Sequence, residues 1–112
     1  MKKYLLVMCI ILLFIPYVKA ADVEKELENN WEMVLNSYKT SPTSKETLDK
    51  IDNFILRWKD SNRYEASRAK YLKGYIFYQD KKYNQAYNEF KELLNNFSGS
   101  SYADSAMYKM GE

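Results

Sequence analysis

The residues with the clearest spacing for chemistry are acidic. Glu24, Glu28 and Glu32 are four residues apart, which places their carboxyl groups on one face of a helix. Two carboxyl groups that face one cleft at a fixed separation can act as the acid and base of a carbohydrate-cleaving enzyme. The alternative is a solvated helix face. We favour this second interpretation, because a small helical body offers little depth for a cleft.

Other catalytic and ligand-binding groups are scarce in the composition. The 112 residues include no histidine, a single cysteine and three glycines. Histidine is the commonest general base and metal ligand, and a lone cysteine forms neither an internal disulfide nor a cysteine cluster for zinc. No phosphate-binding loop of the form G-x-x-x-x-G-K-[ST] occurs. We therefore expect no catalytic residue, no metal ion and no cofactor.

Tyrosine is the abundant polar aromatic residue, with 11 copies. Tyr71, Tyr75 and Tyr78 recur at the spacing that puts side chains on one face of a helix. Such a face can bind a partner, because tyrosine offers a large apolar area together with a hydroxyl group. Equally, the three rings can pack on a neighbouring pair of helices. The spacing alone leaves both interpretations open.

The first 20 residues have the pattern of an export signal. Lys2 and Lys3 precede an uncharged, apolar stretch from Tyr4 to Val18, and Ala20 completes a small-residue cleavage site before Ala21. The stretch is shorter than the roughly 20 residues that span a membrane, so we expect cleavage rather than an uncleaved anchor. Cys9 lies inside the apolar stretch, which argues against lipid attachment there.

The charge left after cleavage is almost balanced. Lys2, Lys3 and Lys19 belong to the leader, so residues 21–112 keep 14 of the 17 basic residues against all 15 acidic ones, a net charge of −1. Nucleic-acid binding requires a basic surface. We expect no nucleic-acid partner, and no insertion into the membrane once the leader is removed.

Residues 21–112 have the periodicity of helices with short breaks. Asp22 is a candidate cap for the first helix and Ser44 for the second. The third helix is expected at about Tyr64–Gln79 and the fourth at Tyr83 to about Asn96, with a last helical piece from near Tyr102. No stretch alternates like a strand. Because each apolar stripe is too narrow to be buried alone, we expect an all-α domain of stacked helix pairs.

A short sequence motif occurs twice in residues 21–112. Residues 69–74 and 106–111 both read A-x-Y-x-x-G, 37 residues apart, and Ala86 and Phe90 follow Gly74 at intervals of 12 and 16 residues. This arrangement resembles the tetratricopeptide repeat, W-x2-L-G-x2-Y followed by A-x3-F. The resemblance implies a helix-turn-helix solenoid of about four helices and a partial fifth, with copies at about 28–61 and 67–100 and a partial copy from 103.

The resemblance also assigns roles to individual positions. Small residues at Gly74 and Ala86 would let paired helices approach closely. Lys70 and Lys73 stand where apolar residues are usual, so we expect their stems to pack while their ammonium groups reach water. The positions assigned to packing within the repeats are Trp31, Tyr38, Gly74, Phe77, Tyr83, Ala86, Phe90 and Gly111. Those assigned to a peptide-binding groove are Arg68, Tyr71, Tyr75, Tyr78, Gln79 and Tyr108.

The segment 97–111 carries a second resemblance, to one group of proteins with these repeats. It is similar to the longer links between repeats in bacterial envelope proteins, such as the periplasmic cell-division coordinator of the Tol-Pal system and the outer-membrane lipoprotein of β-barrel assembly. This similarity implies a periplasmic scaffold that binds an envelope protein or peptide. The soluble Tol-Pal-linked type fits better than the lipoprotein, and a role in β-barrel assembly is the alternative.

The sequence stops within the first helix of its third copy. Either that segment acts as a cap, or another protein completes the stack, or the chain is a truncated product. Met107 and Met110 would be partly uncovered in a monomer, which makes self-association an open alternative.

Overall fold

The computed structural model describes residues 22–111, so the predicted leader and its cleavage site lie outside the described residues. All regular structure within 22–111 is helical, and no strand occurs there, which confirms the all-α prediction. The first helix covers residues 22–40 of the described part. Asp22 already has helical backbone, and the residues before it are not described.

Four further helices follow, separated by short turns. They are α2 (Lys45–Trp58), α3 (Arg63–Gln79), α4 (Tyr83–Asn96) and α5 (Ser101–Met110). The starts of all four helices and the ends of α3 and α4 agree with the sequence prediction to within one residue. The described residues divide into two units between Trp31 and Glu32, and the packing described below lies in the second unit.

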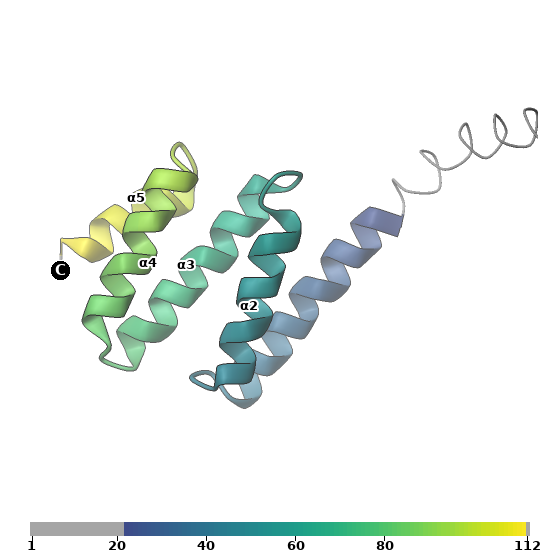
Figure 1. Ribbon diagram of the computed structural model, residues 1–112, viewed down its shortest axis with the longest axis horizontal. Coiled ribbons are helices and arrows are strands. Elements are labelled where there is room, and N and C mark those ends of the chain that lie inside the picture. The colour runs from purple at the N-terminus through teal and green to yellow at the C-terminus, as the bar shows by residue number, and fades with distance from the viewer. Residues whose placement is uncertain (1–21, 112) are drawn as a thin grey trace, which may run out of the picture. The chain divides into compact units, whose positions relative to one another are not determined.

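Within the second unit, α2, α3 and α4 lie side by side, and each runs opposite to the one before it (Figure 1). Helix α5 packs on α4 and α3. Left-handed backbone occurs at Lys81 (φ 62°), in the turn between α3 and α4, and at Gly99 (φ 90°), in the turn between α4 and α5. Glycine adopts this conformation without a steric penalty, whereas lysine does so at some cost.

The Ser44 side chain defines where α2 begins. The Ser44 hydroxyl accepts a hydrogen bond from the Thr47 backbone N–H (3.2 Å), which confirms Ser44 as the cap of α2. The buried Thr47 hydroxyl in turn donates to the Ser41 carbonyl (2.7 Å) and lies 2.7 Å from the Ser37 hydroxyl. These bonds tie the end of the first helix to α2.

The interior of the second unit contains apolar side chains from every helix. Helix α2 buries Ile51, Phe54 and Trp58. A cluster formed by α3, α4 and α5 buries six residues, namely Ala66, Ala86, Phe90, Leu93, Phe97 and Ala106. Alanine and glycine are prominent where these helices meet, and such small residues allow the helix axes to lie close together.

Candidate functional site

Helices α3 and α4 approach each other closely at Gly74. A Cβ atom built on Gly74 would lie 2.7 Å from Cδ1 and 2.9 Å from Cζ of Phe90, closer than real side-chain contacts. The Phe90 ring, which is only 2% exposed, therefore occupies the space above a glycine of α3. Ala86, one turn earlier on α4, is equally buried. These small residues hold α3 and α4 together and position the tyrosines of α3.

The structure places the three α3 tyrosines differently. All three are half-buried, but Tyr71 lies among other rings, with centroids 5.6 Å from Phe90, 5.8 Å from Tyr102 and 6.5 Å from Tyr75. Tyr71 thus contributes to packing between α3, α4 and α5, which was one of the two alternatives left open. Burial and a hydrogen bond with Tyr64 raise the pKa of Tyr102 in the same ring cluster.

Tyr78 instead borders a hollow. Its ring meets Tyr83 edge-on, with centroids 5.7 Å apart, and the Lys109 ammonium lies 4.8 Å from the centre of the Tyr78 ring. The hollow has a volume of about 340 Å³. We call it the tyrosine hollow; it is lined by Tyr78, Tyr83, Ala86, Tyr87, Phe90, Lys109 and Met110.

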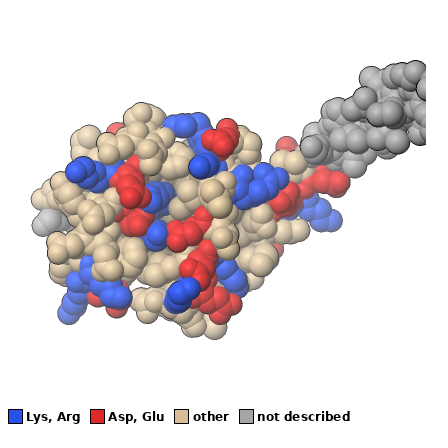
Figure 2. Space-filling model, in the orientation of Figure 1, with Lys and Arg blue, Asp and Glu red and all other residues tan. Residues whose placement is uncertain are grey.

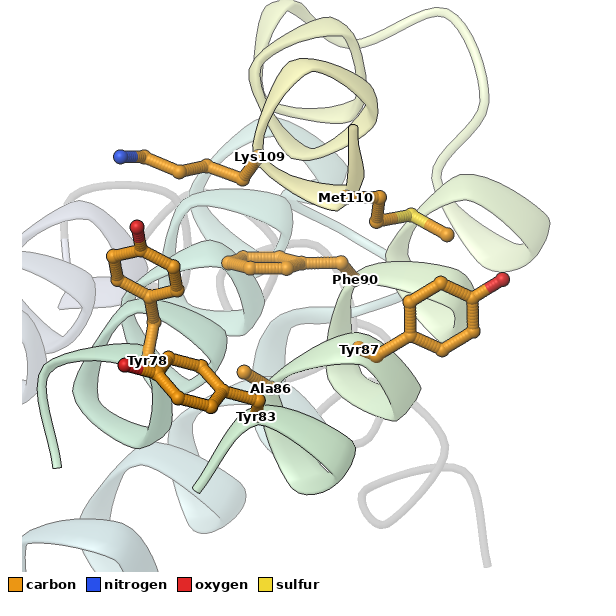
Figure 3. Close-up of a pocket in the computed structure, with 7 residues that line it drawn as sticks. All are labelled: Tyr78, Tyr83, Ala86, Tyr87, Phe90, Lys109 and Met110. Carbon is orange, nitrogen blue, oxygen red and sulfur yellow. The ribbon is translucent and has the colours of Figure 1, made fainter. Parts of the chain in front are cut away.

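Figure 3 shows how these side chains are arranged. The rings of Tyr78 and Tyr83 stand together on one side and Tyr87 stands on the other, with Ala86 and Phe90 between them. Lys109 extends from α5 toward Tyr78. The tyrosine hollow therefore has an apolar floor, aromatic walls and one cation at its edge.

The remaining predicted groove residues are accessible. Arg68 and Gln79 are exposed on α3, and the Tyr108 side chain is 72% exposed on α5. Among the predicted packing positions, Trp31, Tyr38 and Phe77 are half-buried, whereas Tyr83 is 57% exposed. Gly111 is exposed at the end of α5, where a Cβ atom would contact only backbone carbonyls of α5 itself, 3.4 and 3.9 Å away.

Two lysines of α3 are paired across helices, contrary to the expectation that their ammonium groups reach water. Lys73 Nζ lies 2.8 Å from Asp52 Oδ1 of α2 and 3.2 Å from Glu89 Oε1 of α4. Lys70 Nζ lies 2.6 Å from Glu89 Oε2 and also pairs with Glu92. We call these five residues the ion cluster. Opposite charges on two neighbouring helices hold the ammonium groups inward, so they do not extend into water.

The lysines and Glu89 at the centre of the ion cluster are largely shielded from solvent, whereas Asp52 and Glu92 are 50% and 57% exposed. The side chains of Lys70, Lys73 and Glu89 are 11%, 15% and 14% exposed. Burial by itself lowers the pKa of Lys73, but the hydrogen bond to Asp52 and the nearby carboxylates outweigh it, so the pKa of Lys73 is raised above its usual 10.5. Sequence reasoning missed these pairs because their partners are 16 to 22 residues away along the chain.

The outer surface carries charges of both signs. Figure 2 shows lysine and arginine intermixed with aspartate and glutamate over the drawn face. Glu24, Glu28 and Glu32 are all exposed, as the solvated-face interpretation expects. Within residues 22–111, no group of three histidine, cysteine, aspartate or glutamate side chains is arranged to hold a metal ion. No helix in the described range has the length and apolar character needed to cross a membrane.

Comparison with family models, with curated proteins and with solved structures found no match for this chain.

Proposed function

We propose that this protein is a non-catalytic scaffold of the tetratricopeptide-repeat type that binds an envelope protein or peptide on the tyrosine-bearing face of α3 and α5. The observation that carries the proposal is the pair of partly exposed tyrosines on α3, Tyr75 and Tyr78, beside the tyrosine hollow with its apolar floor and aromatic walls. Concave sites lined by aromatic side chains with a few polar groups are typical of binding surfaces. Antiparallel helix pairs joined at Gly74 and Phe90 support the repeat assignment.

The place of action is proposed from the sequence. The basic start, short apolar stretch and small-residue cleavage site of residues 1–20 favour export to a bacterial periplasm. The similarity of segment 97–111 to links in envelope repeat proteins favours a partner in the Tol-Pal and cell-division machinery. Binding there would be non-covalent and would involve no cofactor.

Crosslinking in intact cells, with the full chain as bait, tests the proposal. We expect one dominant crosslinked partner from the envelope, and a weaker yield with Tyr75→Ala. Tyr75→Phe, which keeps the ring and removes only the hydroxyl group, separates loss of a hydrogen bond from loss of the aromatic surface. The matched control is Leu56→Ala, because Leu56 is 67% exposed on α2 and does not line the tyrosine hollow.

Each variant is checked for thermal unfolding before it is compared. Full crosslinking by folded Tyr75→Ala, or equal loss with Leu56→Ala, would contradict binding on the tyrosine face. If the captured partner is a β-barrel assembly component and not a Tol-Pal component, the proposed role in cell division is wrong and the alternative role in outer-membrane protein assembly replaces it.

A further inference from the structure

We propose that two copies of this chain associate through a two-fold contact in which Met107 of each copy enters the tyrosine hollow of the other. The contact joins the sides of α4 and α5 that border the hollow. This inference goes beyond the proposed function, because the occupant is a second copy of the chain and not an envelope protein. Tyr75 does not line the hollow, so the two kinds of binding can be tested separately.

Exposed apolar side chains gather where α5 packs on α4. Tyr83 and Tyr87 of α4 are 57% and 48% exposed, and Met107 of α5 is 61% exposed. Met110 lies one turn after Met107 on the same side of α5, and it lines the tyrosine hollow together with both tyrosines (Figure 3). Met107 therefore stands beside the hollow. We call Tyr83, Tyr87, Met107 and Met110 the α4/α5 strip.

A projecting side chain and a hollow on the same face make a surface self-complementary. A two-fold axis midway between Met107 and the tyrosine hollow places the methionine of each copy opposite the hollow of the other. The hollow has a volume of about 340 Å³, which is room for a methionine side chain. Methionine is also flexible enough to fit irregular walls. One strip therefore supplies both halves of the contact.

The area of the α4/α5 strip suits the centre of a small dimer interface. A large side chain buries about 200 Å² when it is fully covered, so the exposed parts of these four residues offer roughly 400 Å² per copy. A standard interface buries about 800 Å² per partner, of which somewhat more than half is apolar. The strip therefore supplies most of the apolar area, and its polar neighbours supply the rest.

The charges around the strip also favour a second copy. Helix α5 runs toward the start of α4, because Met110 and Tyr83 line the same hollow. The two-fold axis reverses this direction, so the residues that precede Met107 in one copy extend past the hollow of the other. Asp104, one turn before Met107, then lies near Lys81 in the turn before α4. Both are exposed, and neither forms an ion pair within residues 22–111, so each is available to the other copy.

Analytical ultracentrifugation of the chain, purified after expression with its own leader, tests self-association. We expect a monomer at about 5 µM and mainly a dimer at about 500 µM, as a small interface allows. Met107→Glu should raise the dissociation constant by at least about tenfold, because a carboxylate would enter an apolar hollow. Leu56→Glu is the matched control. Leu56 is similarly exposed but lies on α2, so this variant should associate as the unmodified chain does.

Exchange of charges tests the two-fold arrangement. Asp104→Lys and Lys81→Glu each place like charges together at both ends of the contact, so each alone should weaken self-association by about fivefold. An equimolar mixture of the two variants should form a mixed dimer about as tightly as the unmodified chain, because each new charge then meets its opposite. A mixture that associates no better than either variant alone would overturn the arrangement.

Nuclear magnetic resonance locates the contact directly. In a mixture of copies with labelled methionine methyl groups and unlabelled copies, we expect contacts from the Met107 methyl group to the ring protons of Tyr83 or Tyr87. A dimer without these contacts would overturn the inference. So would a monomer at every concentration, or equal weakening by Met107→Glu and Leu56→Glu. Growth into ever larger species would indicate a head-to-tail contact and would overturn it too. Thermal unfolding first confirms that each variant is folded.

Discussion

The two A-x-Y-x-x-G motifs have the same spacing and different surroundings. Ala69 and Ala106 are both fully buried. Gly74, in the first motif, lies under the Phe90 ring, whereas Gly111, in the second, is exposed at the end of α5. Each alanine is therefore buried because it lies on the face of its helix that packs against the neighbouring helices. What a glycine does depends on whether another helix lies across it.

The surroundings also differ at the second and fifth positions of the motif. Lys70 and Lys73 of the first motif correspond to Met107 and Met110 of the second. The lysines face acidic residues on α2 and α4 and join the ion cluster. Met107 is 61% exposed, while Met110 borders the tyrosine hollow. The first motif thus lies between two helices, whose acidic residues pair with its lysines. The second motif has no such partners, and its methionines stay accessible.

Replacement of the tyrosines should give the largest difference between the motifs. Tyr71→Ala removes a ring that contacts Phe90 and Tyr102, and we expect the free energy of unfolding to fall by about 3 kcal/mol, the low end for loss of a packed aromatic side chain. Tyr108→Ala, at 72% exposure, should change it by less than about 0.5 kcal/mol. Urea unfolding measures both. Equal effects would show that the two tyrosines are equivalent after all.

Replacement of the glycines should give the next largest difference. Gly74→Ala drives a Cβ into the Phe90 ring, and the cost of overpacking exceeds the gain in helix propensity, so we expect a net loss of about 2 kcal/mol. Gly111→Ala is the matched control and should be neutral. The double variant Gly74→Ala with Phe90→Leu should recover part of the loss. An unaltered unfolding midpoint for Gly74→Ala would contradict close contact at this site.

The helix caps before the two motifs should differ by a smaller amount. The Ser100 hydroxyl accepts from the Ala103 backbone N–H (3.1 Å), whereas Asn62, at the start of α3, makes no side-chain capping bond. We expect Ser100→Ala to cost about 1 kcal/mol of stability, as loss of a capping side chain usually does. Asn62→Ala should cost little. Thermal unfolding of both variants, compared with the unmodified chain, measures these losses. A larger loss of stability with Asn62→Ala than with Ser100→Ala would contradict the assignment of Ser100 as the stronger cap.

The ion cluster should make stability sensitive to alkaline pH. Because the pKa of Lys73 is higher in the folded protein than its usual 10.5, the resulting stabilisation is fully present below pH 10.5 and is lost as the pH rises through the folded-state pKa. The raised pKa of Tyr102 acts in the same direction above pH 10.0. Lys73→Met, which copies Met110 of the second motif, should flatten this alkaline decline. A decline as steep as that of the unmodified chain would argue against the Lys73 pairs.

The helices and the cap of α2 were largely predictable from local signals, whereas Asp22, the other predicted cap, has helical backbone and the Ser100 cap of α5 was not predicted. Apolar periodicity located α3 and α4, and serine before a charged first turn located the start of α2 at Ser44. Close contact at Gly74 was also anticipated, from the resemblance to the tetratricopeptide repeat, in which small residues at Gly74 and Ala86 would let paired helices approach. The site was predicted less well. The spacing grouped Tyr71, Tyr75 and Tyr78 on one face, but it did not distinguish the packed Tyr71 from Tyr78 at the hollow.

The amino-acid order by itself determined the all-α character and the helix limits, because each depends on interactions within a few residues of the chain. Only the tertiary structure decided which tyrosine is accessible, that Lys70 and Lys73 are paired rather than solvated, and that Tyr83 and Tyr87 of α4 form one hollow with Lys109 of α5. Those properties depend on side chains that are far apart in the sequence and meet only when α2, α3, α4 and α5 pack together.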